Sequence, residues 1–379
     1  MKRRLFLYQT LGALGVSAAC SGPEPEPEME PVAALLDEAK LNAASAHIQK
    51  WVDDGNLRAA SLTVGRGSAG VAHGFGEAKD PNTIFLLASI TKPMTAIGMM
   101  VLADRGELKL EDPVHKFIPE FTEGDRKDIT IKHILSHTSG LPDQLAENVE
   151  MRQRLAPLEE FVKASIKTPL LFKPGTEVKY QSMGLLLASE VAQRITKKPF
   201  RDFLKEVVFT PLGMNHTALG VGDFKIAETA QSQVDKAPAL YGGGDNSSWD
   251  WNSEYWRDLG APWGGAHSTG GDLTKLLNYF LDPDDRVLNP ATAQSMIVDQ
   301  NQGLNKPWGI GFAVEPGSFA KGCSDRTFGH SGATGTLFWA DPATKLTFVM
   351  LTTLPANVSA EPLIQPVADL VSEAVVVNV

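Results

Sequence analysis

The sequence predicts an α/β (α+β) fold, in which helices flank an antiparallel sheet and a mostly α-helical domain is inserted between its strands. Patterns typical of strands occur near both ends of the chain, at 60–66 and 71–76 and again at 309–314, 326–330, 336–340 and 346–353. Helical patterns separated by Pro and Gly fill the middle of the chain. This order favours a sheet assembled from both chain ends.

The helices are predicted from apolar residues that recur three and four positions apart. The first spans 34–54, and the second runs from Ser89 to Arg105, where Gly106 ends it. The other predicted helices are 158–166, 183–195, 200–208, 273–280 and 363–375. We therefore expect residues 34–110 and 300–379 to form the sheet domain and 111–299 to form the insert, which together make one domain over 34–379.

Size and composition exclude several classes of protein. The chain has 379 residues, of which 43% are hydrophobic and 21% charged, so it is long enough for a large core and too apolar to be disordered. Its two cysteines cannot form a disulfide scaffold. A net charge of −10 would repel a phosphate backbone, so we expect no nucleic-acid partner. The oligomeric state stays open.

Residues 1–19 have the pattern of an export signal. Positive residues at 2–4 precede an apolar stretch over 5–16, and small residues follow at 17–19. Arg3-Arg4 resembles a twin-arginine signal. Cys20 comes next, where bacterial lipoproteins carry their acylated cysteine, and 20–33 is a Pro/Glu linker. We expect a protein on the periplasmic side of the cell envelope, anchored to the membrane by lipid at Cys20. The alternative is simple cleavage, which would leave it periplasmic or secreted.

Ser89-Ile90-Thr91-Lys92 is an S-x-x-K sequence at the start of a predicted helix. Three residues make about one helical turn, so the hydroxyl and the amine lie on the same face. Lysine can activate a serine as its base if burial lowers the pKa of the amine. The structural alternative is that Ser89 only caps the helix. A second copy, Ser318-Phe319-Ala320-Lys321, has no helix to align its side chains, and we interpret it as coincidental.

Ser331, within Gly329-His330-Ser331-Gly332-Ala333, is a rival nucleophile because this stretch nearly matches G-x-S-x-G. Enzymes with that elbow place the catalytic histidine after the serine. His330 is the last histidine of the chain, so the order of residues argues against this alternative.

Three further motifs accompany Ser89. They are Tyr180-Gln181-Ser182, His330-Ser331-Gly332 and the stretch 133–142, which contains His137-Thr138-Ser139-Gly140. In this combination the sequence resembles the serine β-lactamase and penicillin-binding protein superfamily over 34–375, within its class C-related branch of esterases and D,D-peptidases. The resemblance implies a β-lactamase/transpeptidase-like fold and a reaction without metal or organic cofactor.

The resemblance assigns a role to each matching residue. Ser89 is the acylated nucleophile, and Lys92 and Tyr180 are its proton-transfer partners. His330 occupies the first position of the family's K-T-G strand, and Lys92 and a protonated His330 are expected to lower the pKa of Tyr180. The backbone N–H groups of Ser89 and Ala333 form the oxyanion hole.

The other residues of these motifs are candidates for substrate contact. They are Ser182, Ser331 and Gly332, and Gly332 is expected to let the substrate backbone approach closely. Ser182 replaces the family's asparagine, whose amide holds a substrate carbonyl, and its alternative role is a helix N-cap. His330 replaces a lysine that grips a carboxylate. Both replacements favour neutral or ester substrates over β-lactams.

Two weaker patterns have competing interpretations. His133 and His137 stand at a zinc-like spacing, but no Glu follows the first histidine, so a metal site is not expected. Four clustered tryptophans either line an acyl or sugar site at the rim of the cleft or pack a long loop onto the domain, and we favour packing; they are Trp249, Trp251, Trp256 and Trp263.

These observations predict a serine hydrolase that acylates Ser89 and acts on small carboxylic esters. The first alternative is a D,D-carboxypeptidase, D-aminopeptidase or β-lactamase acting on peptide or β-lactam amides. An alternative of another class is a penicillin-binding sensor or wall-binding protein that does not turn over its ligand.

Overall fold

The computed structural model describes residues 35–67, 69–239 and 248–376. Its α-helices are α2 (Glu38–Asp53), α3 (Thr91–Asp104), α4 (Ile131–Leu135), α5 (Asn148–Gln153), α6 (Leu158–Lys167), α7 (Met183–Thr196), α8 (Phe200–Leu204), α9 (Glu254–Leu259), α10 (Gly270–Leu281), α11 (Pro290–Met296), α12 (Ala356–Ser359) and α13 (Gln365–Ser372). Its strands are β1 (Ala59–Arg66), β2 (Ala69–Gly76), β3 (Phe85–Leu86), β4 (Ala218–Leu219), β5 (Ala266–Ser268), β6 (Phe328–Gly332), β7 (Thr336–Asp341) and β8 (Leu346–Thr352).

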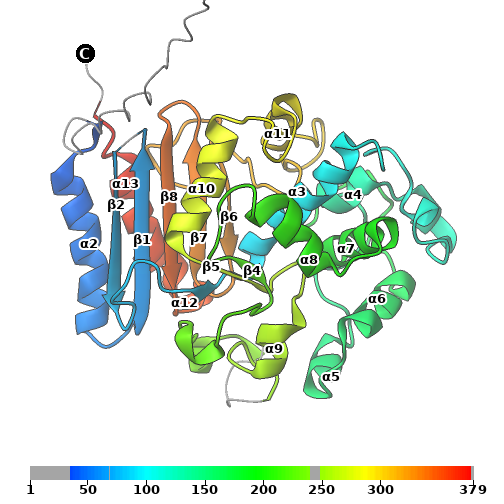
Figure 1. The fold of residues 1–379 in the computed structure, drawn as a ribbon, viewed down its shortest axis with the longest axis horizontal. Helices are drawn as coiled ribbons and strands as arrows, with labels where there is room; N and C mark the ends of the chain where they lie inside the picture. Colours follow the sequence, from blue (N-terminus) through cyan, green and yellow to red (C-terminus); the bar gives the residue numbers. More distant parts are fainter. Residues whose placement is uncertain (1–34, 68, 240–247, 377–379) are drawn as a thin grey trace, which may run out of the picture.

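The main sheet draws its strands from both ends of the chain, which confirms the predicted fold class. Five strands pair antiparallel in the order β2-β1-β8-β7-β6. Helices α2 and α13 cover one face of this sheet and α10 covers the other, α12 lies at one end of the sheet, and helices α3 to α8 gather beside it (Figure 1). Strands β3, β5 and β4 form a second, smaller sheet in that order.

Both faces of the main sheet are buried, and the side chains of its central strands divide between two cores. On β8, Phe348 and Met350 pack in the core with α2 and α13, whereas Val349 and Leu351 belong to the larger core on the opposite face. Successive residues of a strand point to opposite faces, so a strand buried on both sides is apolar without interruption. Residues 348–351, Phe-Val-Met-Leu, have this pattern.

The predicted strand 309–314 is wrong. Only Ala313 makes a β-bridge, to Gly329, and the Gly309 N–H donates to the Phe312 carbonyl in a turn. Gly311 has a φ of +79°, a left-handed conformation that breaks an extended strand.

Other predicted elements are present with shifted bounds. The strand predicted at 326–330 is β6 at 328–332, and the helix predicted at 363–375 is α13 at 365–372, preceded by a π-helical turn. Helix α10 lies in the segment predicted as the insert, yet it packs on the main sheet. The division into two domains stays a prediction.

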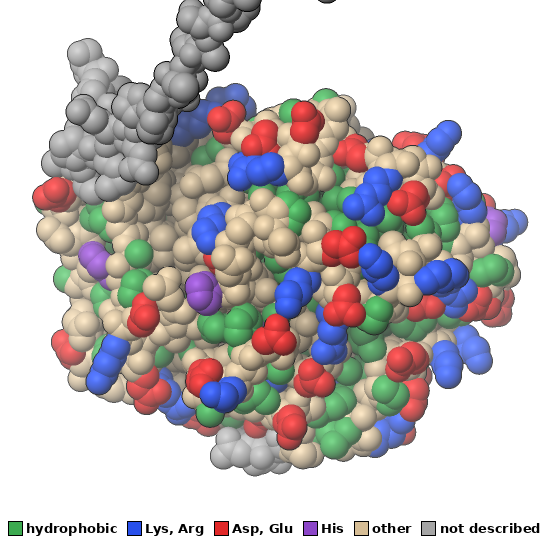
Figure 2. All heavy atoms as spheres, in the orientation of Figure 1, with side chains coloured by type: hydrophobic (Ala, Val, Ile, Leu, Met, Phe, Trp, Pro, Cys, Tyr) green, Lys and Arg blue, Asp and Glu red, His purple; other side chains and the backbone are tan. Residues whose placement is uncertain are grey.

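The surface carries charges of both signs. Lysine and arginine side chains alternate with acidic ones over the face shown in Figure 2. Within residues 35–67, 69–239 and 248–376, no helix has the length and apolar character needed to cross a membrane.

Candidate active site

Ser89 and Lys92 form a hydrogen-bonded pair at the entrance to helix α3. Ser89 lies in the 3-10 turn Ala88–Ile90, and the Lys92 Nζ atom is 2.9 Å from its Oγ atom. Ala88 has a φ of +48°, a strained conformation for a residue with a side chain. The Ser89 side chain is not a helix cap, because Ile90 occupies the N-cap position of α3. The alternative that Ser89 only caps the helix is therefore wrong.

The Lys92 amine is buried in a way that weakens its affinity for a proton. Its side chain is 1% exposed, and burial lowers the pKa of Lys92 to about 7, although the negative charge of Asp143 acts in the opposite direction. Nζ also donates to the Trp263 carbonyl oxygen at 2.9 Å. This bond leaves the nitrogen lone pair of the neutral amine available for the Ser89 hydroxyl.

Tyr180 lies against Lys92 within a group of aromatic rings. The Lys92 Nζ atom is 4.7 Å from the Tyr180 ring centroid, and Tyr180 is surrounded by His137, Trp308 and His330, with ring centroids 4.7, 5.8 and 5.9 Å from its own. The sequence motifs that contain Ser89, Tyr180 and His330 therefore meet in space, as predicted.

His330 is neutral near pH 7. Burial, together with the positive charge of Lys92, lowers the pKa of His330 to about 3. Its Nδ1–H donates to the Ser331 carbonyl oxygen at 2.6 Å, so Nε2 is the acceptor nitrogen, and it has no partner among the described residues. The expectation that a protonated His330 lowers the pKa of Tyr180 is therefore wrong.

The β6–β7 hairpin is fixed against the segment that leads to Ser89. Thr334 Oγ1 donates to the Leu86 carbonyl and Thr336 Oγ1 to the Leu87 carbonyl, each at 2.8 Å. A Cβ atom on Gly332 would lie 2.2 Å from that Leu87 oxygen. Gly332 thus permits a close approach of the chain's own backbone, while the predicted approach of a substrate stays a prediction. Ala333, the next residue, lines the same cavity as Ser89.

A cavity of about 530 Å³ contains these groups. Its wall includes seven of the eight candidates predicted near the site, namely Ser89, Tyr180, Ser182, His330, Ser331, Gly332 and Ala333, whereas Lys92 is buried behind Ser89 and does not line it. A groove of about 1030 Å³ on the helical side is larger, but none of these candidates lines it, so the smaller cavity is the candidate active site.

Three of the four clustered tryptophans line this cavity, namely Trp251, Trp256 and Trp263. Each is at most 5% exposed and belongs to the hydrophobic core. These three residues therefore both pack in the core and line the cavity, as the two interpretations predicted separately. Trp249 does not line the cavity.

The structure adds residues that the sequence did not single out. Trp308, Asp143 and Arg152 line the cavity, and the Arg152 guanidinium lies 3.9 Å from the Trp256 ring centroid. Ser182 is not a side-chain cap for α7, because its hydroxyl donates to Asp143 Oδ1 at 2.5 Å. Asp143 directly follows the 133–142 motif, and this position was the one feature of the sequence that could have placed Asp143 near the site.

The second S-x-x-K copy does not form a pair. Ser318 Oγ donates to the Glu315 carbonyl, whereas Lys321 forms a salt bridge with Asp369 at 2.8 Å. Both interactions support the interpretation of this copy as coincidental.

His133 and His137 have separate roles. His133 completes a capping box with Thr130 at the start of α4. His137 is buried at a φ of +63°, and its Nδ1 accepts from the Gln181 N–H at 3.2 Å. Burial holds the pKa of His137 well below its usual value. In the part of the chain that the structure describes, no three His, Cys, Asp or Glu side chains group to hold a metal ion. Cys20 and the linker lie outside the described residues.

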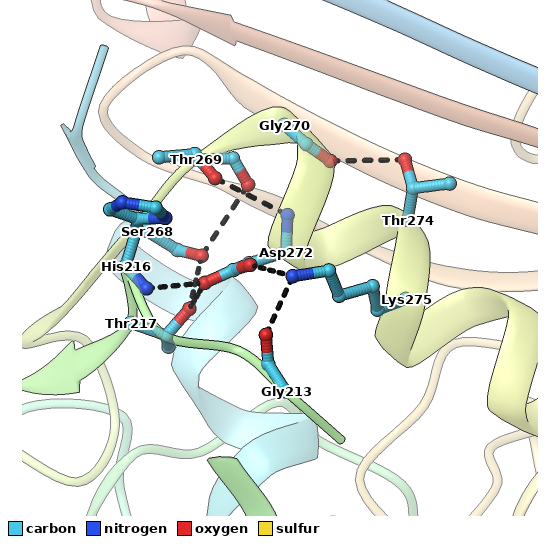
Figure 3. Close-up of polar contacts among 9 residues, drawn as sticks. All are labelled: Gly213, His216, Thr217, Ser268, Thr269, Gly270, Asp272, Thr274 and Lys275. Atoms are coloured by element: carbon cyan, nitrogen blue, oxygen red, sulfur yellow. Dashed lines mark hydrogen bonds and ion pairs between the residues drawn. The ribbon is translucent and has the colours of Figure 1, made fainter. Parts of the chain in front are cut away.

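A buried polar network supports the strand next to the site. Asp272 is 2% exposed and accepts hydrogen bonds from the His216 N–H, from Thr217 Oγ1 and from Lys275 Nζ (Figure 3). Thr217 in turn bonds to Ser268 at the end of β5. This network fixes β5, whose preceding residues supply the carbonyl group that orients Lys92.

Comparisons with known proteins agree with this geometry. A protein of Escherichia coli strain K12 named for D-alanyl-D-alanine carboxypeptidase is 23% identical over 407 residues, covering 95% of this chain and 93% of that protein. The D-amino acid amidase of Ochrobactrum anthropi SV3 superposes with a TM-score of 0.68 at 24% identity, covering 83% of this chain and 91% of that one. EstCE1, a hydrolase with promiscuous acyltransferase activity, superposes with a TM-score of 0.71 at 21% identity, covering 88% and 99%.

At these identities the two solved structures establish the fold, which confirms the predicted β-lactamase/transpeptidase-like architecture. The sequence model of the family described as Beta-lactamase matches residues 44–371, which is most of the chain. The chain therefore belongs to the beta-lactamase family of serine hydrolases.

Proposed function

We propose that this protein is a carboxylesterase that acts on small esters through an acyl-enzyme at Ser89. The observation that carries the proposal is the 2.9 Å hydrogen bond between Ser89 and a buried lysine whose pKa is about 7. A serine hydroxyl needs a base within hydrogen-bond reach, and a lysine serves as one only when it loses its proton near the working pH.

The proposed reaction has two steps. Neutral Lys92 takes the proton of Ser89 as Oγ forms a bond to the ester carbonyl carbon. Tyr180 gives its proton to the departing alcohol as the carbon–oxygen bond breaks, and it takes the proton held by Lys92 in return. In the second step neutral Lys92 takes a proton from the water that adds to the acyl carbon, and this proton returns to Ser89 Oγ as the bond to the acyl group breaks and the acid leaves. The backbone N–H groups of Ser89 and Ala333 stabilise the oxyanion in each step, a contribution of about 3–4 kcal/mol per donor in comparable enzymes.

Two contacts favour esters over β-lactams and acylated peptides. The Ser182 hydroxyl is bound to Asp143, so it offers no free donor to an acylamide carbonyl. His330 is neutral where the family's lysine would grip a carboxylate. A second candidate, D,D-carboxypeptidase activity, is supported by the positive charge of Arg152 in the cavity wall and by the name of the Escherichia coli relative.

The test is hydrolysis of p-nitrophenyl butyrate by the protein beside its Ser89→Ala variant. Turnover that the variant loses supports the esterase, and turnover that it keeps refutes the mechanism. Release of D-alanine from an acylated D-alanyl-D-alanine peptide without ester turnover would favour the carboxypeptidase. A stable penicilloyl adduct on Ser89 without either turnover would favour the sensor.

We also propose that the protein is exported to the periplasmic side of the cell envelope and lipid-anchored at Cys20. The proposal rests on the order of positive, apolar and small residues before that cysteine. Metabolic labelling with radioactive palmitate tests it: the label should be present on the natural protein and absent from Cys20→Ala. Equal labelling of both would refute the anchor.

A further inference from the structure

Asp143 is a carboxylate in the cavity wall that the proposed reaction does not use. It lines the same cavity as Ser89 and Tyr180 and is partly exposed to it. Its Oδ1 atom accepts the hydroxyl proton of Ser182, which is 2% exposed. Because this hydroxyl has one proton to donate, the pair presents only hydrogen-bond acceptors to a substrate at this point.

The charge of Asp143 has no partner among the salt bridges of the described residues. The other carboxylate in the wall, Glu315, is already paired with Lys306 at 2.7 Å. Arg152 packs on the Trp256 ring and donates to the Trp249 carbonyl. Lys92 is largely neutral above pH 7, so it does not compensate Asp143 there.

We propose that Asp143 binds the ammonium group of the substrate's acyl part, so that the site prefers aminoacyl esters to neutral esters of the same shape. This inference rests on the proposed function, because it takes acylation of Ser89 as given. A carboxylate removed from bulk water attracts a cation more strongly than an exposed one does. The tryptophans that share the wall, Trp251 and Trp263, present aromatic surface that also tolerates a cation.

The cavity must hold the substrate ammonium at Asp143 and the scissile carbonyl at Ser89 at the same time. In an amino acid ester they are attached to the same carbon, so a substrate that places its carbonyl at Ser89 holds its ammonium close by. Ser182 follows Tyr180 by two residues and presents Asp143 to the cavity that contains Ser89. Asp143 is thereby a specificity-determining residue, and no proton transfer is assigned to it.

The test compares two esters on the full-length protein near neutral pH. Alanine methyl ester, as each enantiomer, carries the ammonium, and methyl isobutyrate replaces that group by a methyl of similar size. In Asp143→Asn we expect kcat/KM for the better alanine ester to fall about 10- to 100-fold relative to that for isobutyrate, the loss typical of a hydrogen bond to a charged group. The substitution also changes the pKa of Lys92, but this affects both esters and cancels in the ratio.

Glu315→Gln is the matched control, because it removes the paired carboxylate of the same cavity wall and should leave the ratio unchanged. Equal losses on both esters in Asp143→Asn, or an unchanged ratio, would overturn the role of Asp143 while leaving the esterase standing. If the unaltered protein hydrolyses p-nitrophenyl butyrate but neither methyl ester, the inference is overturned and the esterase stands. If it hydrolyses none of the three esters, the proposed function fails and this inference falls with it.

A second comparison needs no variant. Alaninamide should inhibit hydrolysis of p-nitrophenyl butyrate more strongly than isobutyramide does. Equal inhibition by the two amides would contradict the proposal even if Asp143→Asn failed to fold.

Discussion

Lys92 should set the pH dependence of turnover. Its buried amine is hydrogen-bonded to Ser89, and burial lowers its pKa to about 7. Only the neutral amine can take the serine proton, so kcat/KM should rise with pH and level off above the pKa. Below it, each pH unit reduces the neutral fraction tenfold, and activity at about pH 5 should be about 100-fold below the plateau.

The neighbouring histidines should not contribute to this rise. The pKa of His330 is lowered to about 3, and that of His137 lies well below its usual value, in both cases chiefly through burial. Both rings are therefore neutral across the range in which Lys92 loses its proton. A single inflection is expected, with a slope of one.

The assay follows initial rates of p-nitrophenyl butyrate hydrolysis from about pH 5 to about pH 9 at substrate concentrations far below KM, read at the isosbestic wavelength of nitrophenol. Asp143→Asn is a directional control. The charge of Asp143 raises the pKa of Lys92, so its removal should move the inflection to lower pH.

A flat profile over this range would refute the assignment of Lys92 as the base. A rate that still rises tenfold per pH unit at about pH 9 would also contradict the account, because it would mean that the pKa of Lys92 is not lowered to about 7. A shift to higher pH in Asp143→Asn would contradict the electrostatic explanation.

Three further substitutions test the structure around the nucleophile. Lys92→Met should abolish turnover yet raise the free energy of urea unfolding at neutral pH by about 1–3 kcal/mol. Folding lowers the pKa of this lysine, so burial of the charged amine opposes folding at every pH below the pKa of the unfolded chain. Removing this penalty outweighs the loss of the two hydrogen bonds that Nζ makes. Lower stability would contradict this. Gly332→Ala should cost about 2 kcal/mol or more in the same assay, since its Cβ would lie 2.2 Å from the Leu87 oxygen; an unchanged midpoint would contradict the close contact. Trp251→Ala should raise kcat/KM for octanoate relative to butyrate esters about three- to tenfold by lengthening the cavity, and an unchanged ratio would show that Trp251 does not limit the acyl group.

The Ser89–Lys92 pair could be predicted from local sequence because its geometry is local. Ser89 and Lys92 are separated by one helical turn, and the apolar run that follows them predicts burial of the lysine. The central strands β7 and β8 were equally clear, because each contains a run of four buried apolar residues, 337–340 and 348–351, which is typical of a strand buried on both faces.

What the sequence did not reveal depends on contacts between distant segments. The pairing of Asp143 with Ser182 spans 39 positions, and no periodicity signals it. The neutral state of His330 follows from burial beside Lys92, which requires the fold. The strand at 309–314 was predicted wrongly because its apolar residues are typical of a strand, whereas the left-handed conformation of Gly311 cannot be inferred from the residue type alone.

The most direct test of the central claim is the site of covalent labelling by an alkyl fluorophosphonate, which reacts with activated serines. Peptide mass spectrometry should place the label on Ser89 in the natural protein, and the Lys92→Met variant should remain unlabelled. Ser318, in the second S-x-x-K copy, serves as an internal control and should stay unmodified. A label on Ser331 or Ser318, or equal labelling of Ser89 without Lys92, would contradict the claim that Lys92 activates Ser89 as the nucleophile.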